Sequence, residues 1–366
     1  LTHYKVWLIS SLFRIRLNTF AVMKVVVTGG AGYIGSHTII DIVESTNWEI
    51  VSIDSYINST PDTYRRIKEV TGKEIEHYKV DLCDKNALKN VFNEIGAIAG
   101  VIHFAALKAV GDSVENPLLY YQNNITGLLN ILECCANYNI PNLIFSSSCS
   151  IYGNVDVLPV DETTPLAKSE SPYAATKAIG EEILKDFSKV SNTNLIALRY
   201  FNPVGAHSSG LIGENPINKP SNLFPVITQT AVGIIEEMQV FGADYKTRDG
   251  SCIRDYIHVS DIANAHILAL KYAVEQGKLE NLEFYNLGSG NGVSVLEAIS
   301  TFEDLSNIKL NYKLSARRPG DVESIYSNSK KAKSQLDWET KFALTDMMSS
   351  AWNWQQQLEK EKNEQS

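Results

Sequence analysis

The chain has 366 residues, of which 44% are hydrophobic, so it is long enough for a large buried core and more than one lobe. Its 42 acidic residues outnumber 33 basic ones, and the formal net charge of −9 disfavours binding to nucleic acid or to an anionic membrane. The five cysteines are odd in number and contain no C-x-x-C pair, which is typical of reduced thiols in a cytoplasmic protein and predicts no metal site.

The first 22 residues carry Lys5, Arg14 and Arg16 but no acid. Their longest uncharged run, residues 6–13, is too short to span a bilayer. Met23 stands directly before a strand-like run. We therefore interpret Met23 as the natural start and residues 1–22 as an extension outside the fold, with an organellar presequence as the alternative.

From Lys24 to about Asn202, short β-branched runs alternate with longer segments of helical period. The runs are KVVVT, EIVSID, EHYKV, GVIHFAA, NLIFSSS and LIALRYFN. This alternation predicts an α/β fold with a Rossmann-type doubly wound parallel sheet over residues 23–202. Ligands of such sheets bind beyond the carboxyl ends of the strands.

After Asn202 the chain becomes rich in Pro, Gly, Ser and Asn. We expect residues 203–354 to form mainly a smaller mixed α/β lobe that binds substrate, with some segments returning to the large domain. Trp352 and Trp354 are interpreted as packing residues. Residues 355–366 are expected to form a charged tail that frays.

The segment KVVVTGGAGYIGSH places Gly29, Gly32 and Gly35 between a strand and a helix. Glycines at this spacing permit a tight turn and the close approach of backbone N–H groups to a pyrophosphate, and the helix N-terminus adds positive charge. Asp54 ends the next strand, where an acid can accept hydrogen bonds from ribose hydroxyls and would repel a 2′-phosphate. The pattern predicts a dinucleotide site that prefers NAD to NADP.

Two further strand ends point to the same crevice. Asp81 and Leu82 follow EHYKV, near the expected adenine position. The run HFAALK places four more residues close to the dinucleotide: Phe104, Ala105, Ala106 and Lys108. Asp81 could instead cap the following helix, a role that Asp84 could also fill, so both interpretations of Asp81 stay open.

The segment ESPYAATKAIGEE sets Tyr173 and Lys177 four residues apart, so both side chains can point into the crevice. A phenol titrates near pH 10, and Tyr173 becomes a base at neutral pH only if nearby positive charge stabilises its phenolate. Lys177 and the cationic nicotinamide ring of NAD⁺ would supply that charge. Ser148, the outermost serine of NLIFSSS, can bridge Tyr173 and a substrate hydroxyl. We predict that Ser148, Tyr173 and Lys177 are catalytic.

These residues resemble a known family, the UDP-glucose 4-epimerases of the extended short-chain dehydrogenase/reductase superfamily. The resemblance runs from Met23 to about Trp354. It rests on the blocks TGGAGYIGSH, HFAALKAVGDSVENPLLYYQNNITG, FSSSCSIYG, SPYAATK, LRYFNPVGAH, RDYIHVSDIA, YNLGSG and RRPGD. It implies an isomerase of galactose metabolism with tightly bound NAD, which interconverts UDP-galactose and UDP-glucose through a 4-keto sugar. It also implies a cytoplasmic homodimer that forms through a helical face.

The resemblance implies further site residues. Those of the cofactor site would include Tyr33, Ile34, Ser55, Asn58, Ser59, Asn123 and Phe201. The substrate would be contacted by Lys108, Ser148, Tyr173, Asn202, Asn222, Leu223, Phe241, Arg254, Arg318 and Asp321. Arg254 and Arg318 would hold the diphosphate, although Arg254 could instead pair with Asp255 or Asp249. Ile325 stands where relatives differ in bulk, and its intermediate size leaves the acceptance of N-acetylated sugars open.

Several alternatives compete with this function. Another NAD-dependent nucleotide-sugar epimerase, such as a UDP-N-acetylglucosamine 4-epimerase, or an enzyme acting on UDP-glucuronate shares most of these motifs. A 4,6-dehydratase would need an acid pair just beyond the serine, where this chain has Cys149 and Ser150. A non-catalytic NAD-binding regulator typically lacks the tyrosine and lysine, which this chain keeps.

Overall fold

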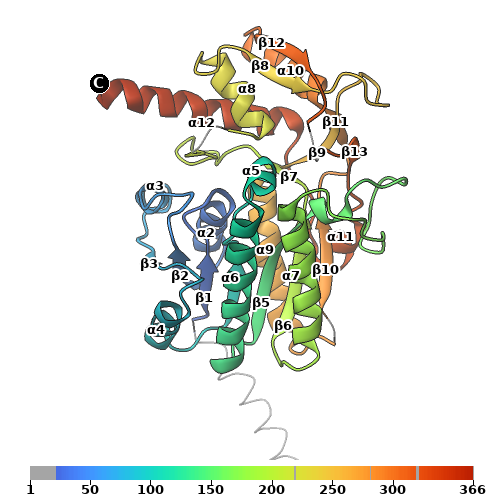
Figure 1. The fold of residues 1–366 in the computed structure, drawn as a ribbon. Coiled ribbons are helices and arrows are strands. Elements are labelled where there is room, and N and C mark those ends of the chain that lie inside the picture. Colours follow the sequence, from blue (N-terminus) through green and yellow to red (C-terminus); the bar gives the residue numbers. More distant parts are fainter. Residues whose placement is uncertain (1–21, 218–219, 281, 319–320, 366) are drawn as a thin grey trace, which may run out of the picture.

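The computed structural model describes residues 22–217, 220–280, 282–318 and 321–365. Figure 1 shows a larger lobe built on a parallel sheet and a smaller lobe above the carboxyl ends of its strands. The extension predicted for residues 1–22 lies outside the described residues, apart from Val22.

Seven parallel strands form the sheet of the larger lobe, in the order β10-β6-β5-β4-β1-β2-β3. They are β1 (Lys24–Thr28), β2 (Glu49–Asp54), β3 (Glu76–Lys79), β4 (Gly100–His103), β5 (Asn142–Ser148), β6 (Asn194–Tyr200) and β10 (Glu283–Leu287). The six predicted runs are β1 to β6, and their parallel pairing confirms the predicted fold class. The strand order reverses at β1, so a ligand crevice is expected beyond the end of that strand.

Helices cover both faces of this sheet (Figure 1). They are α2 (Tyr33–Ser45), α3 (Asp62–Thr71), α4 (Lys85–Ile95), α5 (Val110–Glu115), α6 (Pro117–Asn137), α7 (Pro172–Ser188), α9 (Val259–Gln276) and α11 (Lys330–Leu336), with the 3₁₀ turn η1 (Cys149–Tyr152). One buried apolar cluster contains Ile39 of α2 and Ile267 of α9, and another contains Leu88 of α4 and Ile131 of α6. Each such side chain contributes about 1.5–3 kcal/mol when buried, so the sheet and its helices form a rigid support.

Local signals in the sequence set where two of these helices begin. Ser171 caps α7 by accepting a hydrogen bond from the N–H of Ala174, and Pro172 occupies the first helical position. Asp84 caps α4 by accepting from two backbone N–H groups, so Asp84 rather than Asp81 fills the role that the sequence left open. The start of α7 fixes where Tyr173 leaves the backbone.

The smaller lobe contains short strands and three helices that the structure describes. They are β7 (Asn202–Val204), β8 (Met238–Phe241), β9 (Ile253–His258), β11 (Gly292–Ser294), β12 (Tyr312–Ser315), β13 (Ser324–Ile325), α8 (Leu223–Ala231), α10 (Val295–Ser306) and α12 (Leu344–Gln365). Strand β9 pairs with β7, β11 and β13, and β8 pairs with β12. Trp352 packs on the apolar cluster of this lobe and Trp354 is buried, so the prediction that both tryptophans are packing residues is confirmed.

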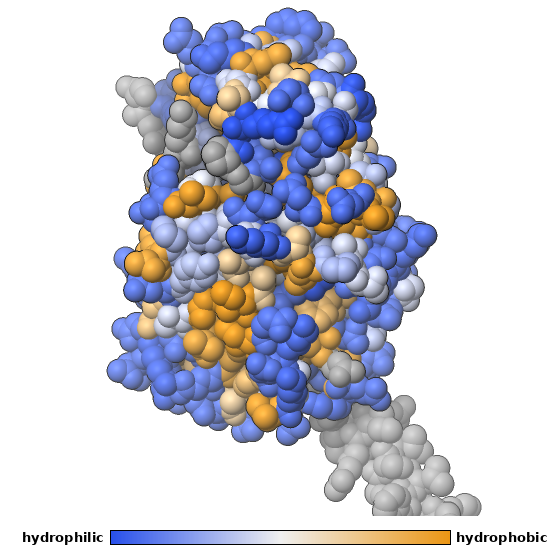
Figure 2. Space-filling model, turned by 45° about the vertical axis from the view of Figure 1, so that its right-hand side comes forward, coloured by the Kyte–Doolittle hydropathy of each residue, from blue (hydrophilic) through white to orange (hydrophobic). Residues whose placement is uncertain are grey.

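The surface of the larger lobe carries exposed apolar side chains among polar ones (Figure 2). Leu118 and Leu129 of α6 are exposed by 74% and 48%, and Ile179 of α7 by 40%. None of the helices that the structure describes is long and apolar enough to cross a membrane. Within the same residues, His, Cys, Asp and Glu side chains form no group of three that could hold a metal ion.

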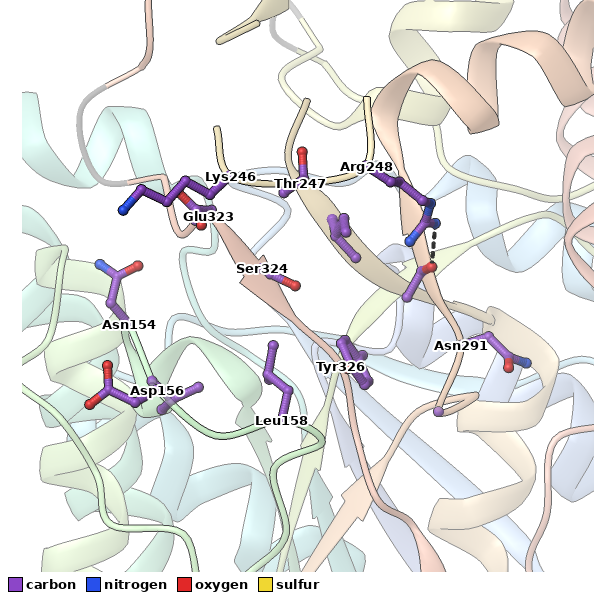
Figure 3. Close-up of a pocket in the computed structure, with 14 residues that line it drawn as sticks. Asn154, Asp156, Leu158, Lys246, Thr247, Arg248, Asn291, Glu323, Ser324 and Tyr326 are labelled. Atoms are coloured by element: carbon purple, nitrogen blue, oxygen red, sulfur yellow. Dashed lines mark hydrogen bonds between the residues drawn. The ribbon is translucent and has the colours of Figure 1, made fainter. Parts of the chain in front are cut away.

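A cavity of about 600 Å³ lies between the loop after η1 and the smaller lobe (Figure 3). Ile253 of β9 and Ser324 of β13 line it. The next residues along the same two strands, Arg254 and Ile325, are paired with each other and do not line the cavity. Since successive side chains of a strand point to opposite faces, the Arg254 side chain points away from this cavity.

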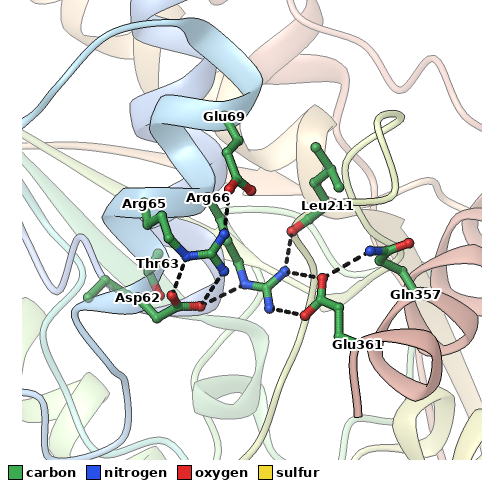
Figure 4. Close-up of polar contacts among 9 residues, drawn as sticks. Asp62, Thr63, Arg65, Arg66, Glu69, Leu211, Gln357 and Glu361 are labelled. Atoms are coloured by element: carbon green, nitrogen blue, oxygen red, sulfur yellow. Dashed lines mark hydrogen bonds and ion pairs between the residues drawn. The ribbon is translucent and has the colours of Figure 1, made fainter. Parts of the chain in front are cut away.

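Helix α12 continues to Gln365, so the charged segment is helical in this structure, while its fraying stays a prediction. Arg66 of α3 holds the end of this helix by donating to Glu361 at 3.1 Å, and the same guanidinium donates to the carbonyl oxygen of Leu211 (Figure 4). The guanidinium also lies 5.0 Å from the ring centre of Trp354. These contacts join the two lobes and explain why the charged segment stays helical.

Candidate active site

The glycine-rich turn between β1 and α2 has room for backbone atoms only. Gly29 has a φ of +72°, and a Cβ at this position would lie 2.7 Å from the backbone nitrogen of Ala105. A Cβ on Gly35 would overlap the carbonyl oxygen of Gly29. No described side chain caps α2 at Gly32, so the N–H groups of its first turn, including that of Ile34, are available to bind a phosphate.

Asp54 is fixed at the end of β2, beside this turn, with an exposure of 8%. Its carboxylate accepts hydrogen bonds from the N–H of Ala31 at 3.0 Å and from the hydroxyl of Ser59 at 2.9 Å. Ser55, Asn58 and Ser59 follow it in the loop that leads to α3. A carboxylate oriented in this way fits the recognition of a ribose diol next to the phosphate-binding turn.

The two further predicted strand ends lie along the same edge of the sheet. The pairing of β4 with β1 continues beyond the strand, because the N–H of Phe104 donates to the carbonyl oxygen of Thr28 at 3.0 Å. This places Ala105 against Gly29, with Ala106 next along the chain. Asp81 and Leu82 follow β3, and the Asp81 carboxylate accepts only a local hydrogen bond, from the N–H of Cys83 at 2.9 Å, among those of the described residues.

The three predicted catalytic residues meet at the ends of β5 and α7. Ser148 is the last residue of β5, and Tyr173 and Lys177 lie on the first two turns of α7, all three buried. The Lys177 ammonium donates to the carbonyl oxygen of Ser146 at 2.6 Å and lies 6.0 Å from the ring centre of Tyr173. The backbone of β5 therefore orients the lysine.

Burial dominates the protonation of these groups. It raises the pKa of Tyr173 to about 12, against which a hydrogen bond with Ser148 acts, and it lowers the pKa of Lys177 to about 8. In the protein groups alone, loss of solvation therefore dominates the pKa of Tyr173. That Lys177 and an oxidised nicotinamide ring together make the phenol a base stays a prediction. A lowered pKa of Tyr173 requires further positive charge, of the kind that a nicotinamide ring carries when oxidised.

Four predicted substrate residues form one cluster in the smaller lobe. Asp321 accepts a hydrogen bond from Arg318 at 2.9 Å and lies 3.6 Å from the guanidinium of Arg254. The Arg318 guanidinium lies 5.4 Å from the ring centre of Phe241. The alternative, an ion pair of Arg254 with Asp255 or Asp249, is wrong. The Asp255 carboxylate accepts hydrogen bonds from Ser289 and Ser327. The Asp249 carboxylate accepts one from the N–H of Ser251. Two guanidinium groups around one carboxylate suit a diphosphate.

Lys108 belongs to the larger lobe and Asn222 to the smaller one. The two predicted substrate residues share a hydrogen-bond partner, Glu214, that the sequence did not indicate. The Glu214 carboxylate accepts from the Lys108 ammonium and from the Asn222 amide, both at 2.7 Å. The Lys108 ammonium also lies 5.7 Å from the ring centre of Tyr33, whose hydroxyl donates to the carbonyl oxygen of Gly205 at 2.6 Å. Glu214 comes from an irregular loop, so no periodic pattern could have indicated it.

The remaining predicted residues come from elements of both lobes. Phe201 follows β6 and packs with Ile325, Asn202 begins β7, and Leu223 begins α8. On α6, the amide of Asn123 donates to Asn124 at 3.0 Å. Asn124 was missed by sequence reasoning. Its amide binds the loop after β4 and the Thr176 hydroxyl of α7, so it ties the cofactor edge to the catalytic helix.

A Rossmann-type sheet with a nucleotide-binding glycine turn and a serine, tyrosine and lysine at its edge defines the class of extended short-chain dehydrogenases/reductases. The family described as GDP-mannose 4,6 dehydratase matches residues 26–351. The chain is 44% identical to the UDP-glucose 4-epimerase of Pasteurella multocida, over 91% of this chain and 97% of that protein. It is 45% identical to the human UDP-glucose 4-epimerase, again over 91% and 97%.

A solved structure gives the same result. The UDP-glucose 4-epimerase of Bifidobacterium longum, in complex with NAD⁺ and UDP, has a TM-score of 0.87 and 40% identity, covering 92% of this chain and 98% of that one. The chain belongs to this sugar-nucleotide epimerase and dehydratase family and, within it, to the UDP-glucose 4-epimerases.

Proposed function

We propose that this chain is a UDP-glucose 4-epimerase, an isomerase that interconverts UDP-galactose and UDP-glucose with tightly bound NAD. The observation that carries the proposal is the convergence of Ser148, Tyr173 and Lys177 at the same edge of the sheet as the glycine turn, in a chain of this family. NAD, when bound, supplies an acceptor for the C4 hydride of the sugar and returns it. The residues around it fit the group, because only backbone fits at Gly29 and Gly35.

The protein residues divide the remaining work. Tyr173 removes the proton of the sugar 4-hydroxyl and later returns one, Ser148 orients that hydroxyl, and Lys177 supports the phenolate. A 4-keto sugar results, and it must turn over before hydrogen returns to its other face. Arg254 and Arg318 hold the diphosphate while the sugar turns. We assign NAD binding to residues 23–202 and UDP-sugar binding mainly to residues 203–354.

The chemistry beyond Ser148 argues against dehydration. Elimination of water across C5 and C6 needs an acid and a base at the positions of Cys149 and Ser150. Burial raises the pKa of Cys149 to about 12, so its thiol stays neutral and is a poor acid or base at neutral pH. The Ser150 hydroxyl donates to Ser148 at 3.0 Å. The neutral thiol and hydroxyl next to Ser148 therefore support an epimerase activity over a 4,6-dehydratase activity.

We further propose a cytoplasmic homodimer. The exposed apolar side chains of α6 and α7, among them Leu118, Leu129 and Ile179, support a second copy as their partner. Covering them would remove apolar surface from water without changing the active site. Light scattering should give twice the chain mass for the wild type, and Leu118→Lys with Leu129→Lys should give a monomer. A monomeric wild type at micromolar concentration would contradict the dimer.

The proposed reaction is tested by incubating the purified full chain separately with UDP-galactose, UDP-N-acetylgalactosamine and UDP-glucuronate, without added NAD. Chromatography should show conversion of UDP-galactose to UDP-glucose, and deuterium at C4 of the substrate should remain at C4 of the product. Label appearing from solvent at C4, or release of a dehydrated sugar, would contradict the mechanism.

A further inference from the structure

Helix α7 carries a third polar residue in line with the two catalytic ones. Tyr173, Lys177 and Glu181 follow each other at four-residue spacing, so they occupy one face of the helix. Glu181 is 2% exposed, whereas its neighbour Glu182 is exposed. A carboxylate buried so deeply needs a partner, because an unpaired buried charge is costly.

Arg199 of β6 is that partner. It donates to both oxygens of the Glu181 carboxylate, through Nε at 2.9 Å and through Nη2 at 2.7 Å. The Ser147 hydroxyl donates to the same carboxylate at 2.6 Å. Ser147 lies between Ser146, which binds the Lys177 ammonium, and the predicted catalytic Ser148. The ion pair therefore connects α7 to the ends of β5 and β6.

The guanidinium of Arg199 is held on its other side as well. Its Nη1 donates to the Tyr152 hydroxyl at 2.9 Å, and the group lies 4.6 Å from the ring centre of Phe284. Four hydrogen bonds thus surround one buried pair. Removing a single partner from such a pair leaves a buried charge uncompensated, whereas removing both does not.

Charged and titratable groups approach Lys177 from several elements. Tyr173 and Glu181 do so from α7, and His103 does so from β4. Arg199 and Tyr200 belong to β6, where the Tyr200 hydroxyl bonds the side chain of Ser146. Burial lowers the pKa of His103 to about 3, so His103 is neutral at neutral pH. Burial also lowers the pKa of Lys177, and Glu181 opposes that effect.

We propose that Glu181 and Arg199 are positioning residues of the active site: their ion pair holds α7 on β5 and β6, and the Glu181 carboxylate offsets the charge of the Lys177 ammonium. Neither residue touches the nucleotide turn or the substrate cluster, so both act through Lys177 and Tyr173. This inference rests on the proposed function, because the lysine needs its charge only if Tyr173 works as a base.

The test compares Glu181→Gln with Glu182→Gln in the full chain with its bound NAD. Titration of the Lys177 side chain is followed by ¹³C NMR on lysine-labelled protein, with the signal assigned by its loss in Lys177→Arg. In Glu181→Gln the midpoint should fall by about one pH unit. The pH above which kcat falls on the alkaline side should decrease by the same amount. Glu182→Gln should leave both unchanged.

If the single variant does not fold, the double variant Glu181→Gln with Arg199→Gln replaces it in the test, since no buried charge is then left unpaired. Glu181→Asp, which keeps the charge, should restore the wild-type midpoint. A wild-type midpoint in Glu181→Gln would overturn the proposal, even if kcat fell. In the double variant the two lost charges cancel, so there an unchanged kcat would overturn it, because the pair would then not position α7. Absence of epimerase activity in the wild type would instead contradict the proposed function, while the NMR titration would still test the pair.

Discussion

Lys177 donates to the backbone carbonyl oxygen of Ser146, two residues before the end of β5, at 2.6 Å. The carbonyl belongs to the strand that presents Ser148, so the ammonium and the serine hydroxyl share one rigid support. Tyr173 leaves the same helix one turn earlier, and the ammonium lies 6.0 Å from its ring centre. The predicted catalytic residues are therefore placed by backbone geometry before any ligand binds.

Replacing Tyr173 with phenylalanine should abolish turnover while preserving the fold. The ring would still fill its buried position, but no group would remove the substrate proton. We expect kcat to fall by about 10²–10⁴-fold. Bound NAD, measured after heat release, and the circular dichroism spectrum should match the wild type. An unchanged kcat would show that another group is the base.

Gly29→Ala should remove bound NAD, because its Cβ would lie 2.7 Å from the backbone nitrogen of Ala105. Gly72 is a matched control. Its φ is +73°, close to the +72° of Gly29, but no atom lies within 4 Å of its would-be Cβ. Gly72→Ala should cost about 1–2 kcal/mol in the free energy of unfolding and keep NAD. Equal loss of NAD in both variants would contradict a steric role for Gly29.

Arg318→Met should weaken UDP binding about ten- to a hundredfold, as expected for a lost charge-assisted hydrogen bond. The neighbouring Arg317 is similarly exposed and bonds Asp244 at 2.8 Å instead of Asp321. Arg317→Met should therefore leave the Kd close to that of the wild type. Isothermal titration with UDP measures both. Equal affinities in the two variants would remove Arg318 from the diphosphate site.

Stability should fall on the acid side of neutral pH. Burial lowers the pKa of His37 and His103 to about 3 and that of His266 to about 4. Their stabilising contribution is present above the unfolded value of about 6.5 and is lost as pH falls towards the folded values. Burial raises the pKa of Asp261 to about 6, which acts in the opposite direction.

The expected result is a lower urea midpoint at pH 5 than at pH 7. His266→Leu should reduce this pH dependence, because one buried imidazole no longer has to gain a proton. Leu would lose only the bond of Nδ1 to the Ile262 carbonyl oxygen at 2.8 Å, since the Nε2 atom of His266 has no hydrogen-bond partner among the described residues. Equal acid sensitivity of this variant and the wild type would exclude His266 as a source.

Ile325 should limit the size of the sugar. It is 4% exposed and packs with Phe201 and Tyr152 at the junction of the lobes. Ile325→Ala should raise kcat/KM for UDP-N-acetylgalactosamine relative to UDP-galactose, at a cost of about 2–5 kcal/mol in the free energy of unfolding. Ile325→Phe is the opposite change and should lower that ratio. If the ratio of the two kcat/KM values did not change with the size of the side chain at residue 325, Ile325 would not limit the size of the sugar.

Most of the larger lobe could be predicted because its strands are short β-branched runs bounded by turn residues. The runs that became β1 to β6 also end in the residues that reach the ligand edge, such as Asp54 and Ser148. Strand β10 was not assigned to this sheet, since only tertiary contact brings Tyr285 beside Leu198. The contact that holds the last helix was missed for the same reason, because Arg66 lies far from Glu361 in the sequence.

In the candidate site, the sequence motifs predicted the residues that would contact ligands. They were less informative about the residues that hold those side chains in place. Glu181 could have been found, since it continues the four-residue spacing of Tyr173 and Lys177. Glu214 and Asn124 could not, because their roles depend on contacts between separate segments. The pKa of Tyr173 also escaped prediction, because burial depends on the whole packed structure.

Because the ion pair between Arg66 and Glu361 joins an early helix to the last one, the order of synthesis matters for folding. On the ribosome, β6 emerges with an open edge until β10 has been made, and Arg66 can bond Asp62 and Leu211 but not Glu361 until the last helix is complete. A nascent chain would carry the nucleotide turn and the catalytic helix long before the second lobe could close over them. Chaperone contact during translation is therefore expected at the edge of β6.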